Sequence, residues 1–202
     1  MKRKRIILVL LVGLLLIIGM AAVLFFQFAR PEGSGPAGPK IARETYSRPW
    51  SDRPVLLVGL GDSVTAGFGA RKGYAYFDRL IKNPTDEFPD LKNISLSAVF
   101  PYLSATNLAV SGSTSGEVVS RQLSLLPTND VSMRGVVVMT TGGNDLIHNY
   151  GRTTPREEAM YGATWEQAHP WVANFASRLE EIIAQTKKTV SRRVRYLFGK
   201  YL

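Results

Sequence analysis

Residues 54–67 read PVLLVGLGDSVTAG, a continuous apolar run followed by a small, polar turn that contains glycine. A short apolar run without alternation is typical of a strand that is buried on both faces of a parallel sheet. We therefore expect a buried strand over residues 54–60. In parallel sheets the binding and reacting groups gather at the carboxyl ends of the strands, so the turn that follows this strand is a candidate functional segment.

Two further segments repeat this pattern of an apolar run that ends at glycine. Residues 107–111 (NLAVS) precede Gly112, and residues 135–141 (GVVVMTT) precede a pair of glycines. Apolar residues also recur at helical spacing, which predicts helices over residues 74–81, 117–126 and 164–188. Strands that alternate with helices predict an α/β fold, in which a parallel sheet is covered by helices on both faces.

The first turn, GDSVTAG over residues 61–67, places Ser63 directly after the first predicted strand. A serine at a tight strand-to-helix turn presents its hydroxyl above the sheet edge, beside backbone N–H groups, and this suits a nucleophile in acyl transfer. A simpler interpretation also stands, in which Asp62 and Ser63 only cap a helix. The first turn alone does not decide between the two.

The other two turns carry groups that could stabilise negative charge. Gly112, in the segment SGSTS over residues 111–115, lets a backbone N–H approach a ligand. The third turn, GGND over residues 142–145, holds Asn144, whose side-chain amide could donate to a developing oxyanion. Each of these turns is a weak signal by itself, because serine-rich and glycine-rich turns are common.

Taken together and in this order, the segments GDSVTAG, NLAVSG and GGND resemble the sequence blocks of the SGNH, or GDSL-type, serine hydrolases. That family contains esterases, lipases, thioesterases and carbohydrate deacetylases, and the resemblance covers roughly residues 55–148. It implies a flavodoxin-like, three-layer α/β/α sandwich around a five-stranded parallel sheet. It also implies a reaction without cofactor or metal, on an ester of a lipid, another acyl group or an acetylated carbohydrate.

The same resemblance assigns roles to individual residues. Ser63 would be the nucleophile, and the oxyanion hole would consist of the backbone N–H groups of Ser63 and Gly112 with the side chain of Asn144. Asp145 is expected to be a structural partner of its turn rather than a member of a catalytic triad. The residues that would support the three turns are Gly61, Asp62, Gly143 and Asp145.

The base is the part of the family pattern that this sequence lacks. A serine hydroxyl is a poor nucleophile unless a base removes its proton, and the family supplies a histidine from an Asp-x-x-His block near the C-terminus. His148 has an aspartate three residues before it, Asp145, but that pair belongs to the third turn, and neither histidine lies in an Asp-x-x-His block near the C-terminus. His148, four residues after Asn144, is a weak candidate for the base, and its alternative interpretation is a polar loop residue. His169, which precedes Pro170, is expected to be a turn residue at the start of a helix.

The charge of the chain is concentrated at its two ends. The 202 residues carry a net charge of +9, but four of the 25 Lys and Arg residues lie within residues 1–5 and six within residues 187–202. The body between them is almost neutral, which argues against a surface that binds nucleic acid. The absence of cysteine excludes disulfide scaffolds, thiolate metal sites and cysteine catalysis.

An uncharged, apolar run over residues 6–29 follows the basic residues 2–5. As a helix it would span about 36 Å, enough for a hydrocarbon core of roughly 30 Å. It is longer than the apolar part of a signal peptide and ends in bulky residues, so we expect a retained anchor rather than a cleaved signal. The cations before the span predict a single-pass membrane protein with a cytoplasmic N-terminus and an extracytoplasmic body.

These patterns divide the chain into a basic tip with an anchor (residues 1–30), a Pro/Gly linker (31–50), an incomplete hydrolase-like domain (51–189) and a basic tail (190–202). We expect the later strands and the Asp/His block of the family to be missing. Two interpretations of the tail stay open. It is either a basic terminus that contacts phospholipid, or out-of-frame sequence, since a shift of one base permits a turn and a buried strand there.

The leading functional hypothesis is a membrane-anchored serine ester hydrolase. The alternative is an inactive fragment or binding module that keeps the three turns and lacks the Asp/His block.

Overall fold

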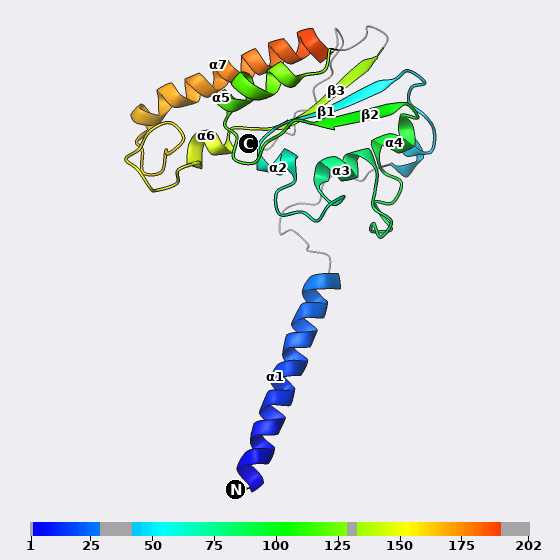
Figure 1. Cartoon of the computed structure of the whole chain (residues 1–202), viewed down its shortest axis with the longest axis vertical. Coiled ribbons are helices and arrows are strands. Elements are labelled where there is room, and N and C mark those ends of the chain that lie inside the picture. Colours follow the sequence, from blue (N-terminus) through cyan, green and yellow to red (C-terminus); the bar gives the residue numbers. More distant parts are fainter. Residues whose placement is uncertain (1, 29–41, 129–132, 191–202) are drawn as a thin grey trace. The chain divides into compact units, whose positions relative to one another are not determined.

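Figure 1 shows the computed structural model, which describes residues 2–28, 42–128 and 133–190. The chain forms two compact units, Met1–Ile41 and Ala42–Leu202. In the first unit, helix α1 (Lys2–Phe28) contains a stretch, Lys4–Phe25, that is long and apolar enough to cross a membrane. The protein buries none of that stretch. A membrane anchor and a signal sequence both have these properties.

The second unit is built on a sheet of three parallel strands, β1 (Val55–Gly61), β2 (Leu103–Asn107) and β3 (Arg134–Thr140). The strand order is β2-β1-β3, so β1 lies in the centre. Every residue of β1 is buried, which explains why its sequence is a continuous run of apolar residues and glycine. In the register between β1 and β3, Gly61 pairs with Thr140, so both strands end at the same edge of the sheet.

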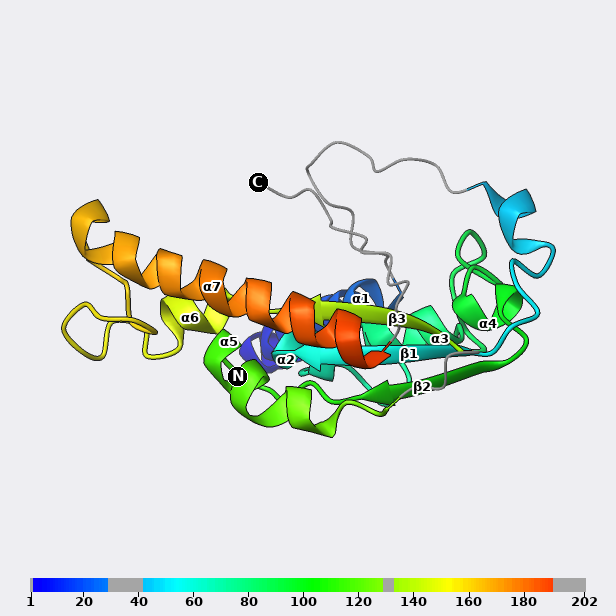
Figure 2. The ribbon, with the colours of Figure 1, turned by 90° about the horizontal axis from the view of Figure 1, so that it is seen from above.

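Helices cover both faces of this sheet (Figures 1 and 2). One face carries α5 (Ser115–Glu117), the π-helical turn η2 (Val118–Gln122), the 3₁₀ turn η3 (Leu123–Leu125) and α7 (Trp165–Val190). The other face carries α2 (Ser63–Ala66), α3 (Tyr76–Ile81) and α4 (Leu96–Val99). The remaining short helices are η1 (Arg43–Tyr46) and α6 (Gly143–Ile147). The expected three-layer α/β/α sandwich is confirmed, with three parallel strands in the described part of the chain.

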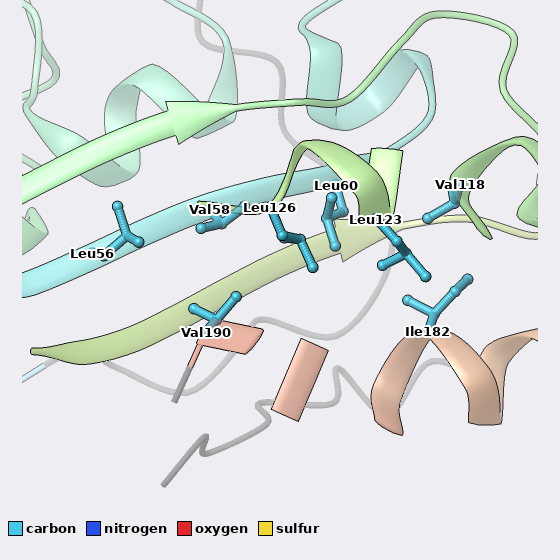
Figure 3. Close-up of a cluster of buried hydrophobic side chains, with 8 residues drawn as sticks. All are labelled: Leu56, Val58, Leu60, Val118, Leu123, Leu126, Ile182 and Val190. Carbon is cyan, nitrogen blue, oxygen red and sulfur yellow. The ribbon is translucent and has the colours of Figure 1, made fainter. Parts of the chain in front are cut away.

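The largest apolar cluster lies between the sheet and the layer that contains α7 (Figure 3). Its eight buried residues come from β1, from the segment 118–126 and from α7: Leu56, Val58, Leu60, Val118, Leu123, Leu126, Ile182 and Val190. Side chains alternate between the faces of a strand, so the neighbouring β1 residues Val55 and Leu57 are buried on the other side. Each such side chain contributes about 1.5–3 kcal/mol when it is fully buried, so the buried side chains on both faces of β1 hold this strand at the centre of the unit.

The predicted position of the second strand is wrong. We expected residues 107–111, and the strand is Leu103–Asn107, with the sequence LSATN. This strand lies at the edge of the sheet and is partly exposed, so its sequence is not a continuous apolar run. The chain continues beside β1 after Asn107, because the N–H groups of Leu108 and Val110 donate to the carbonyl oxygens of Gly59 and Gly61.

The helix predictions hold with two differences. The segment 117–126 is helical but irregular, because α5, η2 and η3 follow one another with different hydrogen-bond spacings. His169 was expected to be a turn residue, and it lies inside α7 instead. The helix begins before Pro170 because Thr164 and Gln167 cap it reciprocally, the Thr164 N–H donating to Gln167 Oε1 at 2.9 Å and the Gln167 N–H donating to Thr164 Oγ1 at 3.4 Å.

Candidate active site

The first turn begins where β1 and β3 approach each other closely. Gly61, the last residue of β1, has a φ of +108°, and a Cβ at this position would lie 1.8 Å from the carbonyl oxygen of Thr140. The Asp62 N–H donates to that same oxygen at 2.9 Å. Only glycine fits at position 61, because any side chain would collide with the backbone of β3.

Asp62 and Ser63 differ in what they do in this turn. Asp62 is buried and caps α2, because its Oδ1 accepts a hydrogen bond from the Val64 N–H at 3.0 Å. Ser63 is the first residue of α2 and is half-buried, and its Oγ has no hydrogen-bond partner among the described residues. The helix-capping interpretation therefore applies to Asp62 and leaves the hydroxyl of Ser63 available.

The second turn is tied to the first through the backbone. The Val110 N–H donates to the carbonyl oxygen of Gly61 at 3.0 Å, and the Ser113 N–H closes the turn on the carbonyl oxygen of Val110 at 3.1 Å. Gly112 lies inside this turn with a φ of +87°, a conformation that favours glycine. Gly112 is half-buried, and its N–H has no acceptor among the described residues.

Gln122, which no sequence motif indicated, links the first two turns. Its buried side chain accepts from the Gly61 N–H and donates to the Gly61 carbonyl oxygen, both at 2.8 Å, and its Nε2 also donates to Ser113 Oγ at 3.3 Å. The sequence did hold a signal, since Gln122 lies four residues from both Val118 and Leu126, on the apolar face of a helical segment. A polar residue there needs a buried partner.

The third turn is clamped onto the second by two side chains. Asp145 is buried, and its Oδ2 accepts from the Ser115 N–H at 2.8 Å while its Oδ1 accepts from the Ser115 hydroxyl. The Nδ2 of Asn144 donates to the carbonyl oxygen of Ser113 at 2.9 Å. The three turns therefore form one hydrogen-bonded assembly at the carboxyl edge of the sheet.

Glycine is required in the third turn at position 142 rather than at 143. Gly142 has a φ of +105°, and a Cβ there would lie 2.9 Å from the ring of Phe175 in α7. A Cβ at Gly143 would meet nothing within 4 Å. Gly143 was the expected supporting residue of this turn, but the close approach of the turn to α7 depends on its neighbour Gly142.

Three residues at this edge each carry an N–H group that has no acceptor among the described residues. Within residues 42–128 and 133–190, neither the Ser63 N–H nor the Gly112 N–H has an acceptor, and Asn144 uses one of its two amide N–H groups on Ser113. A ligand oxygen that accepts from these groups would supply the partners they lack. They are the donors that the resemblance assigned to an oxyanion hole.

The two histidines lie in different surroundings. His148 follows α6, its N–H donates to the carbonyl oxygen of Asn144 at 3.1 Å, and its Cε1 lies 3.5 Å from the position that a Cβ on Gly112 would take. It is exposed and adjoins the second turn. His169 contacts Trp165 instead, with ring centroids 5.7 Å apart. In the described ranges, no group of three or more His, Cys, Asp or Glu residues is placed to hold a metal ion.

Exposed apolar side chains border the first two turns. Val64 and Val110 are exposed, and Phe68 has 80% of its surface exposed. The Phe68 N–H donates to the carbonyl oxygen of Ser63 at 2.9 Å, so this side chain belongs to the same turn as the serine. Apolar side chains beside a few unpaired polar groups are typical of sites that bind small molecules.

Comparison with known protein families identifies the family of the chain. The model of the GDSL-like Lipase/Acylhydrolase family matches residues 60–197, about two-thirds of the chain. None of the curated proteins compared with the chain matches it. Because the matched region covers more than half of the chain and includes all three turns and α7, the chain belongs to the GDSL-like lipase/acylhydrolase family of hydrolases.

Proposed function

We propose that this protein is a membrane-anchored serine ester hydrolase. The Oγ of Ser63 attacks the carbonyl carbon of an acyl or acetyl ester while a base takes the serine proton, and the carbonyl oxygen becomes an oxyanion. The N–H groups of Ser63 and Gly112 and the amide of Asn144 donate to that oxyanion. The intermediate then collapses, the bond to the alcohol oxygen breaks, and the base returns its proton to that oxygen, which leaves an acyl group on Ser63. Water adds to this acyl group while the base takes its proton, and a second collapse releases the acid and returns the proton to Ser63 Oγ.

The observation that carries this proposal is the presence of four unused groups at one edge of the sheet. The Ser63 hydroxyl, the N–H groups of Ser63 and Gly112, and one N–H of Asn144 have no partner among the described residues. They belong to three turns that Gln122 and Asp145 lock together through buried hydrogen bonds. Donors that are held in place before the reaction stabilise the transition state without reorganisation, which supports acyl transfer.

The surroundings of Ser63 support an ester with an apolar part. Val64, Phe68 and Val110 expose apolar surface beside the serine and the second turn. An acyl chain that covers these side chains gains about 25 cal/mol for each Å² of apolar surface removed from water. A lipid or another acyl ester would use this contact, whereas an acetylated carbohydrate would leave most of it exposed.

The presence or absence of a base decides between a serine ester hydrolase and the alternative function, a binding module. The sequence has no Asp-x-x-His block near the C-terminus, and His148, three residues after Asp145 in the third turn, is the histidine that adjoins the second turn. With His148 as the base, the site would turn over esters. Without a base, the same donors would bind an ester or a carboxylate without turnover, which is the function of a binding module.

The anchor and its orientation form part of the proposal. We propose that α1 keeps residues 1–30 in the membrane with the N-terminus in the cytoplasm, that residues 31–50 are a linker, and that residues 51–189 form the extracytoplasmic domain.

After an alkaline carbonate wash of membranes from expressing cells, the full chain is expected to stay in the pellet, because an apolar helix of this length partitions into lipid. Protease should digest the domain when it is added to intact cells in which it can reach the outer surface of the membrane that α1 crosses. A soluble product cleaved near residue 30 would contradict the retained anchor.

Labelling of the full chain in detergent with a fluorophosphonate probe tests the nucleophile. The probe is expected to modify Ser63, because it reacts with serines that sit beside an oxyanion hole. The Ser63→Ala variant should lose the label, whereas Ser111→Ala, which removes an exposed serine of the second turn, should keep it. Peptide mapping that places the label on Ser111, Ser113 or Ser115 would contradict the assignment.

The same preparation distinguishes the enzyme from the binding module. If His148 is the base, His148→Ala should lower the hydrolysis of a short-chain chromogenic ester by about 10²-fold or more, a typical contribution of general base catalysis. His169→Ala is the matched control and should leave the rate unchanged. Binding of the ester with no turnover by the unmodified chain would favour the binding module.

A further inference from the structure

A chain of four oxygen atoms lies behind the first turn, and neither the sequence blocks nor the proposed mechanism uses it. The Tyr76 Oη lies 2.7 Å from Thr65 Oγ1, which lies 2.8 Å from Thr140 Oγ1. The Thr140 hydroxyl in turn donates to Asp62 Oδ1 at 2.7 Å. These residues come from α3, α2, the end of β3 and the cap of α2, so the chain of oxygens connects three elements around Ser63.

Counting protons gives this chain a single direction. Each hydroxyl has one proton, and an ionised carboxylate has none to donate. The Thr140 proton is used on Asp62, so the contact between the two threonines must use the proton of Thr65. The contact between Thr65 and Tyr76 must then use the tyrosine proton. Donation therefore runs from Tyr76 to Thr65, from Thr65 to Thr140, and from Thr140 to Asp62.

Burial keeps this direction fixed at neutral pH. Thr65 has no exposed surface and Asp62 has only 7% of its surface exposed, so water does not compete for these hydrogen bonds. Burial has the largest effect on the pKa of Tyr76 and raises it, the hydrogen bond with Thr65 lowers it by less, and the negative charge of Asp62 raises it by a still smaller amount. The phenol therefore keeps the proton that orients the other hydroxyls.

The chain of oxygens also accepts hydrogen bonds from backbone N–H groups of α2. The Val64 N–H donates to Asp62 Oδ1, the Thr65 N–H donates to Thr140 Oγ1 at 3.2 Å, and the Ala66 N–H donates to the Asp62 carbonyl oxygen at 2.9 Å. Among the described residues, the N–H of Ser63 is the one in this helix without an acceptor. Two of these three hydrogen bonds, those from the Val64 and Thr65 N–H groups, are accepted by atoms of the oxygen chain, Asp62 Oδ1 and Thr140 Oγ1.

We propose that Thr140 is a positioning residue for the nucleophile, and that Tyr76 keeps the hydroxyl of Thr140 in the donating orientation. Thr140 holds the Asp62 carboxylate and the Thr65 N–H together, and this fixes the first turn with the N–H and hydroxyl of Ser63 free for substrate. The proposal rests on the proposed function, in which Ser63 is the nucleophile and its N–H is an oxyanion donor. It adds two residues that act on Ser63 through Asp62 and Thr65 rather than on the substrate.

The test uses the full chain in detergent and three substitutions at the end of β3. Thr140→Val removes the hydroxyl with little change in shape, Thr140→Ser keeps a hydroxyl, and Thr141→Val makes the same change at the next residue. Thr141 is a matched control because its buried Oγ1 has no hydrogen-bond partner among the described residues. Fluorophosphonate labelling of Ser63 gives a limiting rate constant and a binding constant, and hydrogen exchange measures the protection of the amides of residues 62–67.

Thr140→Val is expected to lower the limiting rate constant of labelling by about 10²-fold, the effect of losing one well-placed oxyanion donor, with little change in the binding constant. It should also accelerate exchange at Val64 and Thr65. Thr140→Ser should restore both properties, and Thr141→Val should leave both unchanged. Tyr76→Phe should lower the limiting rate constant by roughly tenfold, since it removes one hydrogen bond and lets Thr65 reverse its donation.

Equal labelling and equal exchange in Thr140→Val and Thr140→Ser would overturn the proposal. Weaker binding of the probe with an unchanged limiting rate constant would also overturn it, because a residue that positions the nucleophile acts on the reaction step. If the unmodified chain is not labelled at Ser63, the proposed function is wrong. Exchange at Val64 and Thr65 in the same variants would then decide whether Thr140 orders the turn.

Discussion

Replacing Gly61 with alanine is expected to lower the free energy of unfolding of the domain by about 4 kcal/mol, as a sum of backbone strain and overpacking. The added Cβ would lie 1.8 Å from the carbonyl oxygen of Thr140, and the residue would keep a φ of +108°, which side chains disfavour. Either β3 moves away from β1, or the turn that carries Ser63 changes its path. Thermal unfolding of the full chain in detergent should show a fall in Tm of roughly 10 °C, together with loss of labelling at Ser63.

The matched control is Gly69→Ala. Gly69 also has a positive φ, of +78°, but a Cβ there would meet no atom within 4 Å. This substitution carries only the conformational cost of the left-handed region, about 1–2 kcal/mol. The difference between the two variants therefore measures the close approach of β1 and β3. Equal losses of stability would show that the contact with Thr140 is not what requires glycine at position 61.

Replacing Asp145 with alanine is expected to destabilise the domain by about 3–5 kcal/mol, because hydrogen bonds to a charged group contribute about 1.5–3 kcal/mol each. The carboxylate accepts from both the backbone N–H and the hydroxyl of Ser115, and both donors are buried. Without it the third turn loses its main contact with the second turn, so the amide of Asn144 moves relative to the N–H of Gly112. Chemical denaturation and the rate of Ser63 labelling should both report the loss.

Asp86→Ala provides the comparison for Asp145→Ala. Asp86 is also a paired carboxylate, because it accepts from Tyr74 and from Arg71, but both side chains of its ion pair are largely exposed to water. Exposed pairs of this kind contribute little to stability, so Tm and labelling should stay at the values of the unmodified chain. If Asp145→Ala proves as mild as Asp86→Ala, the clamp between the second and third turns does not hold the site together.

The positions of the candidate site residues could be predicted because they follow strands. Ser63 and Asn144 come directly after apolar runs, and the carboxyl ends of parallel strands meet at one edge of a sheet. The roles of these residues in catalysis stay a prediction. The second strand was misplaced because an edge strand does not need an apolar sequence, and residues 108–111 lie after its last residue, Asn107.

The choice between Gly142 and Gly143 could not be made from the sequence. The two residues are neighbours in the segment GGND, and the difference between them is the ring of Phe175, which reaches Gly142 from α7. A pair of glycines in a turn indicates that one backbone position is unusual. Which one it is depends on the packing of a helix more than 30 residues away in the chain.

The sequence by itself determined the α/β class, an apolar N-terminal helix and three turns in family order, because each of these is a local pattern of a few adjacent residues. Only the tertiary structure decided which side chains hold the turns: Thr140 for Asp62, Gln122 for Gly61 and Asp145 for Ser115. The partners in these pairs are 78, 61 and 30 residues apart. A buried hydrogen bond requires two groups to meet within about 3 Å, and the packing of the strands and helices, rather than any local sequence pattern, brings these groups together.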